Sequence, residues 1–421
     1  MFKIHPRPYL LINKIQPYDW GTRGEQAFIP NFFWLESSNT EPYAELWIGA
    51  HPNAPSDVLM DGERVPLPDL IAKYPYEILG RSVEDSFSGR FPFLLKILSV
   101  AEPLSIQAHP DKLQAQSLHR RDPVNYPDDN HKPEMVVALD SFSALIGFRS
   151  VSEIVIQLSK HPELVKFLHL HELHGSLNAR DHIPSQEENI LKSLVTSIVE
   201  KSRRDPDQFE RVMDTIYEKL SQSTGVLSEE EILFVNLKNK YPNDVGLLFI
   251  FLLRKVHIKK GQGFFTKPRT AHAYLEGNVV ECMASSDNVV RAGLTKKFVD
   301  NETLIDILDY DSKPVPILQR DSDCDEFQYQ TPADEFRVST LELDPPKEKW
   351  VLTGKGPVVF LIMDGTIMIQ WNHGGENQRE TFSKGQAILI PDILDTLEII
   401  PLDSVKIFQV DVPIKNSGHN Q

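Results

Sequence analysis

The stretch Ser105-Ile-Gln-Ala-His-Pro110 decides how the rest of the chain is interpreted. Gln107 and His109 stand two positions apart in it. Side chains of a β-strand alternate between its two faces, so both residues are expected to project from one face of a strand. This spacing predicts a pair of ligands on a β scaffold, in contrast to the helical His-Glu-x-x-His arrangement of metalloproteases.

Two distant segments contain donors of the same kind. Asn130-His-Lys-Pro-Glu134 provides a carboxylate, and Ala271-His-Ala-Tyr274 provides a second imidazole. Each residue alone is more often an ordinary polar or loop residue than a ligand. Together they offer two imidazoles and two oxygen donors, a set that suits a borderline divalent ion such as zinc: Gln107, His109, Glu134 and His272.

The composition is that of an ordinary soluble globular protein, with 421 residues, 41% hydrophobic and 25% charged. The net charge of −16 argues against nucleic acid or an anionic membrane as a partner. The apolar run at 246–253 is far shorter than the roughly 20 residues that span a bilayer, and the N-terminus lacks the pattern of a signal peptide. Two cysteines imply no disulfide framework, so we expect a cytoplasmic protein.

The texture of the sequence changes along the chain. Residues 1–150 contain short apolar runs between loops, which predict strands, and residues 151–257 follow the 3.6-residue period of amphipathic helices. Strand texture returns in residues 258–320 and continues in residues 321–421. We therefore predict a mainly β protein whose first β domain is interrupted by a helical insert and is followed by a second β domain.

Several long motifs, in the same order along the chain, are similar to those of a known family. The chain resembles the monofunctional, type I zinc-dependent mannose-6-phosphate isomerases of the cupin superfamily. Besides the segments quoted above, the resemblance rests on Tyr18-Asp-Trp-Gly21, Ala44-Glu-Leu-Trp-Ile-Gly-Ala-His-Pro52 and Glu281-Cys-Met-Ala-Ser-Ser-Asp-Asn-Val-Val-Arg-Ala-Gly293.

The resemblance implies a cupin-type β-barrel, or jelly-roll, that carries one zinc ion per chain. It also implies an inserted helical domain and a C-terminal cupin-like domain without metal. The expected reaction interconverts mannose-6-phosphate and fructose-6-phosphate through an enediolate, which a divalent ion can stabilise. We expect a monomer whose partner is a small sugar phosphate.

The resemblance also suggests roles for individual residues. Arg291 is the first candidate for the phosphate, because a guanidinium binds phosphate oxygens bidentately. Further substrate-binding candidates are Lys96, Ser105, Trp20, Glu45 and Tyr274. Glu281, Lys132, His131 and Asp287 all lie in matched motifs and are candidates for proton handling, and of these Lys132 and Glu281 are expected to move the proton or orient the sugar. A catalytic lysine would need a pKa depressed by burial or by a neighbouring cation.

Two other functions fit parts of the pattern. One is an iron-dependent cupin oxygenase or epimerase, although Gln107 and Arg291 weigh against it. The other is a noncatalytic sensor of sugar phosphates. We interpret the histidines at 169, 171 and 174 as a solvated surface of the insert, because their spacing does not place all three on one helix face. The bulky lead-in Lys267–Ala271 departs from the small residues usual in the family, so it could shift the loop or place Arg269 at the mouth of the site.

Overall fold

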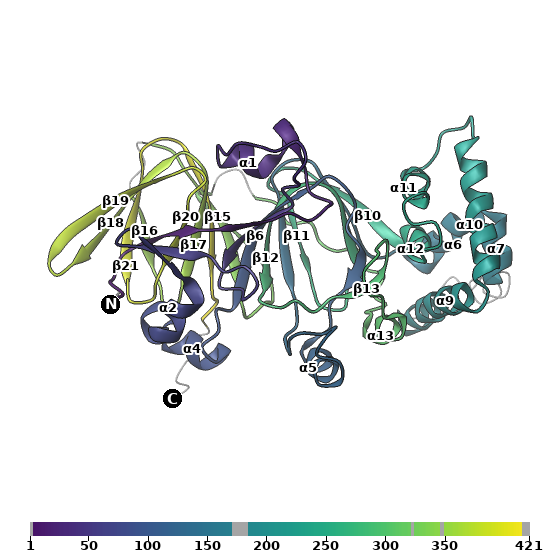
Figure 1. The fold of residues 1–421 in the computed structure, drawn as a ribbon, viewed down its shortest axis with the longest axis horizontal. Coiled ribbons are helices and arrows are strands. Elements are labelled where there is room, and N and C mark those ends of the chain that lie inside the picture. Colours follow the sequence, from purple (N-terminus) through teal and green to yellow (C-terminus); the bar gives the residue numbers. More distant parts are fainter. Residues whose placement is uncertain (1–2, 171–183, 321–323, 346–348, 415–421) are drawn as a thin grey trace.

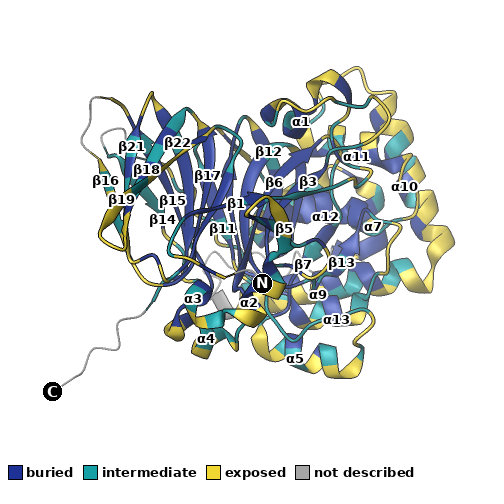
Figure 2. Ribbon diagram, turned by 60° about the vertical axis from the view of Figure 1, so that its left-hand side comes forward, coloured by how far each residue is buried: buried dark blue, intermediate teal, exposed yellow. Residues whose placement is uncertain are grey.

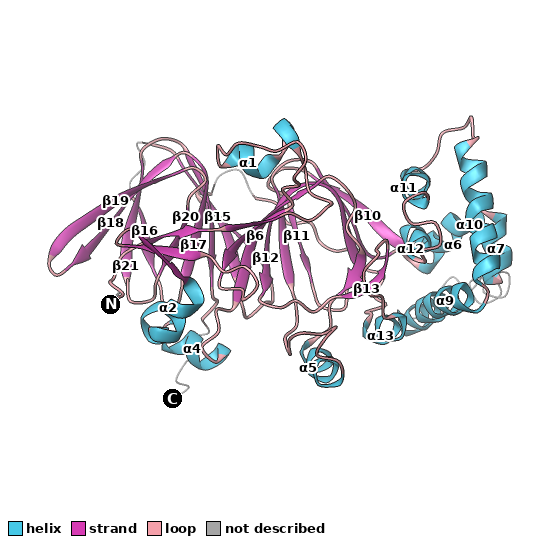
Figure 3. Cartoon of the chain, in the orientation of Figure 1, coloured by secondary structure: helices cyan, strands magenta, loops and turns pink. Residues whose placement is uncertain are grey.

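The computed structural model describes residues 3–170, 184–320, 324–345 and 349–414. Three bodies lie in a row along the long axis of the molecule (Figure 1). A β body formed largely by the C-terminal residues stands at one end, a second β body lies in the middle, and the helical insert stands at the other end (Figures 1 and 3). This arrangement confirms the predicted mainly β fold with a helical insert.

The middle body is a curved ten-stranded sheet that encloses an interior. Its pairings run as an open path, β10-β9-β12-β6-β3-β2, with β7, β8, β11 and β13 attached beside it, so curvature encloses the interior without a closed ladder. The strands are β2 (Lys14–Gln16), β3 (Glu45–Gly49), β6 (Phe93–Val100), β7 (Ile106–Ala108), β8 (Glu134–Ala138), β9 (Phe142–Phe148), β10 (Leu253–Ile258), β11 (Gly263–Thr266), β12 (His272–Ala284) and β13 (Val290–Gly293).

The alternation of side chains sorts these strands into an inner and an outer face. On β6, Leu98 and Val100 point into a core inside the sheet, whereas Leu95 and Ile97 point outward into the core shared with the C-terminal body. On β8, Val136 points inward and Met135 points outward in the same way. Any polar residue in register with the inward positions therefore faces the interior.

The C-terminal body contains two sheets whose shared interior is filled by aliphatic side chains and Phe and Trp rings. The smaller sheet contains β16 (Trp350–Thr353), β21 (Thr396–Pro401), β18 (Thr366–His373) and β19 (Glu376–Ser383). The larger sheet runs in the order β14 (Glu326–Tyr329), β15 (Arg337–Leu343), β22 (Val405–Asp411), β17 (Val358–Asp364), β20 (Ala387–Ile390), β1 (Tyr9–Ile12), β4 (Asp57–Met60) and β5 (Glu63–Pro66).

Strands β1, β4 and β5 thus extend the sheet of the C-terminal body although they come from the first 66 residues. Tyr9 pairs with Leu389, and Leu11 pairs with both Ala387 and Val58. The predicted start of the second β domain at residue 321 therefore leaves out three N-terminal strands that belong to its sheet. Because the N-terminal segment completes the C-terminal sheet, the chain crosses from one β body to the other near its start, and the two bodies also share an apolar core.

The insert contains the helices α6 (Val151–Ser159), α7 (Pro162–Leu168), α9 (Pro184–Arg204), α10 (Pro206–Ser221), α11 (Glu229–Lys238) and α12 (Gly246–Leu252). Its buried faces form one core with the adjacent outer face of the middle sheet (Figure 2). The chain turns from helix to strand at Leu253, before the predicted end of the insert at residue 257, because residues 253–258 pair with β9. Of the three histidines predicted on this surface, His169 is exposed, and those at 171 and 174 lie outside the described residues.

The remaining helices are short and cover loops between strands. They are η1 (Gly24–Gln26), α1 (Phe28–Phe32), α2 (Leu67–Lys73), α3 (Pro75–Leu79), α4 (Arg81–Phe87), α5 (Lys112–Arg121) and α13 (Asn301–Ile307). Among the helices of the described ranges, none combines the length and the apolar character that crossing a membrane requires.

Candidate active site

Three predicted metal ligands meet inside the middle sheet. His109 follows β7, Glu134 begins β8 and His272 begins β12, and all three are at least 98% buried. Their ligand atoms all lie within 4.8 Å of one another. Glu134 stands between the imidazoles, with Oε1 3.2 Å from His109 Nε2 and Oε2 3.3 Å from His272 Nε2. The structure therefore brings together residues that are separated by up to 163 positions along the chain.

The hydrogen bonds of the imidazoles show that this cluster suits a cation. His109 Nδ1 lies 2.7 Å from the carbonyl oxygen of Asn288, which can only accept, so Nδ1 carries the proton. His109 Nε2 is then a lone pair that faces a carboxylate oxygen, and it is a buried atom without a hydrogen-bond partner. Two buried acceptors in such contact are unfavourable unless a positive charge lies between them. His272 Nδ1 is held in the same way by the carbonyl of Thr270, at 2.9 Å.

Burial and charge set the protonation of the three groups. Burial lowers the pKa of His109 to about 4, which leaves the ring neutral and able to ligate. Burial would also lower the pKa of His272, but the hydrogen bond to Glu134 and its charge outweigh burial, so the pKa is raised. Burial opposes the charged form of Glu134, yet the two imidazoles hold its pKa well below its ordinary value. A divalent ion would take the place of the proton that Glu134 favours on His272.

The fourth predicted ligand, Gln107, lies beside His272. Its Nε2 is 3.4 Å from His272 Nε2, and its Oε1 accepts a hydrogen bond of 3.3 Å from the Ser105 hydroxyl. A metal would need the amide oxygen, so ligation by Gln107 requires the amide to turn over. Ser105 is thereby placed next to the predicted shell, where it can orient the amide.

A chain of buried polar groups leads away from the metal cluster along the inward positions. The Tyr274 hydroxyl donates to Glu281 Oε1 at 2.8 Å and lies 3.5 Å from Glu134 Oε2. Glu281 Oε2 is 3.4 Å from Lys96 Nζ, which is also 3.2 Å from Glu45 Oε2. All five groups come from the inward positions that strand alternation defines.

Glu281 and Lys96, two members of this row of buried polar groups, differ in their protonation. Burial raises the pKa of Glu281, with Lys96 opposing the rise, and a carboxyl of this kind is suited to proton transfer. Burial would lower the pKa of Lys96, but Glu45 and Glu281 outweigh it and raise the pKa, so Lys96 stays protonated. Because two carboxylates neutralise Lys96, it offers less charge to a phosphate than the sequence suggests.

Two more of the predicted proton-handling residues lie near the cluster. Lys132 is 8% exposed, and its Nζ lies 3.8 Å from Glu134 Oε1. Asp287 is held by His51 Nε2 at 3.3 Å and by the Asn53 amide at 2.8 Å. Burial opposes ionisation of Asp287, but the hydrogen bond and charge of His51 outweigh it and lower its pKa. Asp287 is therefore an ionised acceptor and not a proton donor at neutral pH.

Arg291 lies on the other side of the cluster. It is directly opposite Gln107 in the pairing of β13 with β7. Its neighbours Val290 and Ala292 point into the core of the helical insert, so Arg291 points to the opposite face, which it shares with Gln107. It forms no ion pair with any described carboxylate, and burial lowers its pKa. An unpaired, partly desolvated guanidinium is well suited to bind an anion.

Lys297 is a second cation near Arg291. Burial lowers the pKa of Lys297, and the charge of Arg291 lowers it further. Its Nζ lies 5.5 Å from the centre of the Tyr18 ring, and Tyr18 stacks on Trp20 with ring centres 6.0 Å apart. Trp20, predicted as a wall of the sugar site, is half-buried at the rim of the interior core. Two cations and two rings therefore lie on one side of the interior.

The unusual lead-in Lys267–Ala271 forms a fixed loop. The Arg269 guanidinium donates to the carbonyls of Ile307 and Leu308 at the end of α13, so it does not serve as a free cation at the mouth. The Arg269 backbone N–H donates to the His109 carbonyl at 2.6 Å. The loop therefore ties two ligand-bearing segments together, at the cost of a left-handed φ of 75° at Arg269.

The fold brings three further residues into the site whose roles the sequence did not predict. His51 and Asn53 hold Asp287, and Lys297 accompanies Arg291. A signal for His51 was present, because Ala-His-Pro occurs at 50–52 as well as at 108–110. The carbonyls of Thr270 and Asn288 leave no signal, since any residue type carries a backbone carbonyl.

The fold and the site together define a β protein with a buried His-Glu-His cluster that suits a divalent metal ion, with buried titratable groups beside the cluster and two cations, Arg291 and Lys297, on one side of it. Comparison with known proteins agrees with this class. The family model for the catalytic domain of type I phosphomannose isomerase matches residues 9–151. The mannose-6-phosphate isomerase of Ogataea parapolymorpha is 34% identical over 393 residues, covering 86% of this chain and 88% of its own length. The human mannose-6-phosphate isomerase is 36% identical over 390 residues, with coverage of 86% and 89%.

Solved structures agree over nearly the whole chain. A zinc-bound mannose 6-phosphate isomerase superimposes with a TM-score of 0.80 at 28% identity, covering 97% of this chain and all of its own. A variant of the phosphomannose isomerase from Salmonella typhimurium gives a TM-score of 0.81 at the same identity and coverage. The protein belongs to the type I phosphomannose isomerase family.

Proposed function

We propose that the protein is a zinc-dependent isomerase that interconverts mannose-6-phosphate and fructose-6-phosphate. Family membership supports the reaction, and the buried His109, Glu134 and His272 cluster supports the metal. The observation that carries the proposal is the unpartnered Nε2 of His109, which faces the Glu134 carboxylate. When bound, a divalent ion supplies Lewis-acid stabilisation of the negative charge that develops on the sugar oxygens at carbons 1 and 2.

The side chains next to the cluster would handle the proton that moves between these carbons. Glu281 has a pKa raised by burial, and the Tyr274 hydroxyl holds one of its oxygens. Lys132 lies close to Glu134 on the inward face of the same segment. Asp287, ionised and fixed by His51 and Asn53, can orient sugar hydroxyls. The buried walls exclude water, which strengthens each of these interactions.

Arg291 and Lys297 would bind the phosphate. Both cations are partly buried, the charge of one lowers the pKa of the other, and an anion between them would relieve this repulsion. Arg291 can contribute a bidentate contact, whereas Lys297 contributes a point charge. The substrate would then extend from the metal cluster, beside Gln107, to these cations near Tyr18 and Trp20.

Elemental analysis and kinetics test the proposal. We expect zinc in the purified protein and isomerisation of mannose-6-phosphate, and His109→Ala should lose both together. Because two histidines and one carboxylate also form the usual shell of non-haem iron, iron in place of zinc without isomerase activity would favour an oxygenase. Zinc without turnover would favour a sensor of sugar phosphates.

A further prediction separates the phosphate site from the metal site. Arg291→Ala should keep its zinc but show a lower kcat/KM for mannose-6-phosphate. The drop should correspond to about 2–4 kcal/mol of lost transition-state stabilisation, because a charged, desolvated contact is removed. Arg291→Lys should recover part of the loss. Inorganic phosphate should inhibit the parent more than the variant. Arg379→Ala, an exposed arginine on β19, is the control. Unchanged KM and unchanged inhibition by phosphate in Arg291→Ala would place the phosphate elsewhere.

A further inference from the structure

The segment that enters β8 has two chemically different faces. Lys132 and Glu134 point into the interior, as shown by their contact at 3.8 Å. Met135 and Val137 point outward into the core shared with the C-terminal body. His131 is in register with these outward residues, so its side chain leaves the catalytic interior and points toward the C-terminal body.

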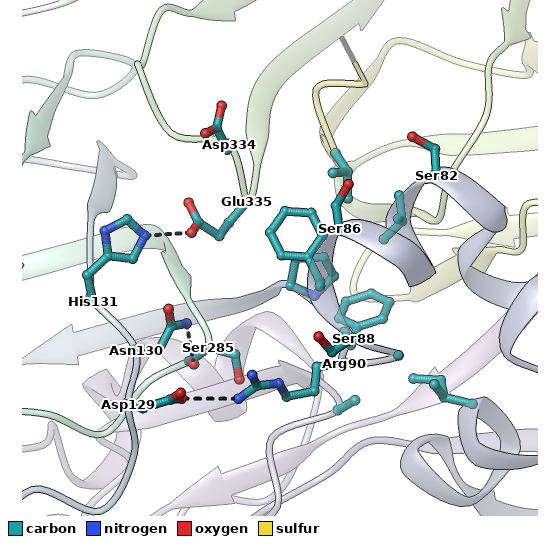
Figure 4. Close-up of a pocket in the computed structure, with 18 of the residues that line it drawn as sticks. Ser82, Ser86, Ser88, Arg90, Asp129, Asn130, His131, Ser285, Asp334 and Glu335 are labelled. Atoms are coloured by element: carbon teal, nitrogen blue, oxygen red, sulfur yellow. Dashed lines mark hydrogen bonds and ion pairs between the residues drawn. The ribbon is translucent and has the colours of Figure 1, made fainter. Parts of the chain in front are cut away.

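There His131 meets Glu335, which lies between β14 and β15 of the C-terminal body. His131 Nε2 donates to Glu335 Oε1 at 2.5 Å, and Figure 4 shows the two side chains facing each other. Glu335 is 7% exposed, and its second oxygen is buried without a hydrogen-bond partner. Among the residues that the structure describes, Glu335 is the hydrogen-bond partner of the His131 side chain.

Packing alone does not hold the His131 ring. The ring borders a cavity of about 880 Å³ between the two β bodies, which is also lined by Phe87, Arg90 and Ile414. One residue earlier, the Asn130 amide donates to the Ser285 carbonyl at 3.1 Å, which anchors that residue within the middle body. A side chain at a cavity wall can rotate unless a directional bond holds it. The contact with Glu335 therefore sets the orientation of His131.

We propose that Glu335 is a positioning residue for the isomerase reaction: through His131 it fixes the backbone on which Lys132 projects toward Glu134. Lys132 stands between His131 and Pro133, and the ring of Pro133 restricts the backbone on its other side. Glu134 itself is held separately by the pairing of β8 with Thr266 and Met283. Loss of the Glu335 contact should hence displace Lys132 and leave the metal cluster in place.

Kinetics of matched variants test this inference, which rests on the proposed role of Lys132. Glu335→Ala should lower kcat for mannose-6-phosphate by about tenfold or more, because small displacements of a catalytic group have large effects on rate. KM and the zinc content should stay near those of the parent. Glu335→Gln keeps an acceptor oxygen for His131 and should restore most of the rate. Asp334→Ala, which removes the adjacent carboxylate at the same cavity, should leave kcat within about twofold of the parent.

The route through Lys132 has its own test. In a Lys132→Ala background, Glu335→Ala should cause no further loss of rate, because residues that act as a unit are not additive. His131→Ala should match Glu335→Ala, and the double variant should be no worse than either. A kcat within twofold of the parent in Glu335→Ala, or equal losses in Asp334→Ala, would overturn the inference. If Glu335→Ala does not fold, His131→Gln with the same readouts decides. A parent that does not isomerise mannose-6-phosphate would refute the proposed function instead.

Discussion

Replacing Tyr274 with Phe tests the link between the metal cluster and the proton-handling carboxyl. The hydroxyl donates to Glu281 at 2.8 Å and lies 3.5 Å from Glu134, at the outer limit of a hydrogen bond. The side chain is 3% exposed, so the substitution removes one oxygen and leaves almost no cavity. Its effect should therefore arise from the lost hydrogen bond alone.

The magnitude follows from the charge and burial of the partner. A hydrogen bond to a buried charged group contributes roughly 1.5–3 kcal/mol, so the free energy of unfolding should fall by about 2 kcal/mol. Removing a donor disfavours the ionised form of Glu281, whose pKa burial already raises, so this pKa should rise further. We expect kcat to fall by about 10–100-fold, the usual effect of losing an outer partner in a metal site. Metal affinity should fall less, because the contact with Glu134 is long.

Three measurements on the variant test this reasoning. Denaturant unfolding gives the stability change, a chelator competition gives the zinc affinity, and the pH dependence of kcat should show its acidic limb moved to higher pH. Tyr329→Phe is the matched control: its side chain is 1% exposed and its hydroxyl donates to the Gly261 carbonyl at 2.8 Å, away from the site. It should lose stability without losing rate. Parent kinetics in Tyr274→Phe, with an unmoved acidic limb, would refute the assigned role of Glu281.

Two further predictions concern the docking of the helical insert. A Cβ at Gly293 would lie 2.1 Å from the Asp244 carboxylate, so Gly293→Ala should lower the free energy of unfolding by about 1–3 kcal/mol. A Cβ at Gly354 would meet open space, so Gly354→Ala is the control and should change the free energy of unfolding little. Equal denaturation midpoints for the two variants would contradict this prediction. Burial opposes ionisation of Glu153, but two hydrogen bonds from Arg254 help to outweigh burial and bring its pKa from 4.5 to about 2. A carboxyl whose pKa is lowered in the folded state stabilises the fold at pH values above its unfolded pKa. The Glu153 side chain is 41% exposed, so the difference in stability between the parent and Glu153→Gln should be at most about 1 kcal/mol, and it should vanish as pH falls from 4.5 toward 2. A difference that grows on acidification would contradict the sign.

Local patterns in the sequence predicted much of the secondary structure. The short apolar run from Phe93 to Leu98 lies in β6, and the segment around Phe209, whose apolar residues follow the 3.6-residue period, forms α10. The capping-box pattern, a Ser followed three residues later by a Glu, occurs in the sequence at Ser228 and Glu231, and the structure has this box at the start of α11. The same pattern occurs at Ser185 and Glu188 and predicts a helix that starts after Ser185, but Ser185 lies inside α9, which already begins at Pro184. Patterns of this kind succeed because they depend on neighbours within a turn of helix or a few residues of strand.

The sequence also pointed to three residues that the structure brings together as one buried cluster, because His109, Glu134 and His272 stand in recognisable segments. Their chemistry is a property of residue type and spacing, which the chain carries before it folds. How these ligands are held was decided only by folding. The carbonyl of Asn288 that sets the proton of His109, the pairing of Lys96 with two carboxylates, and the contact of His131 with Glu335 all join residues far apart in the chain. Such contacts depend on the register of paired strands and on the packing of whole sheets, which no local pattern encodes.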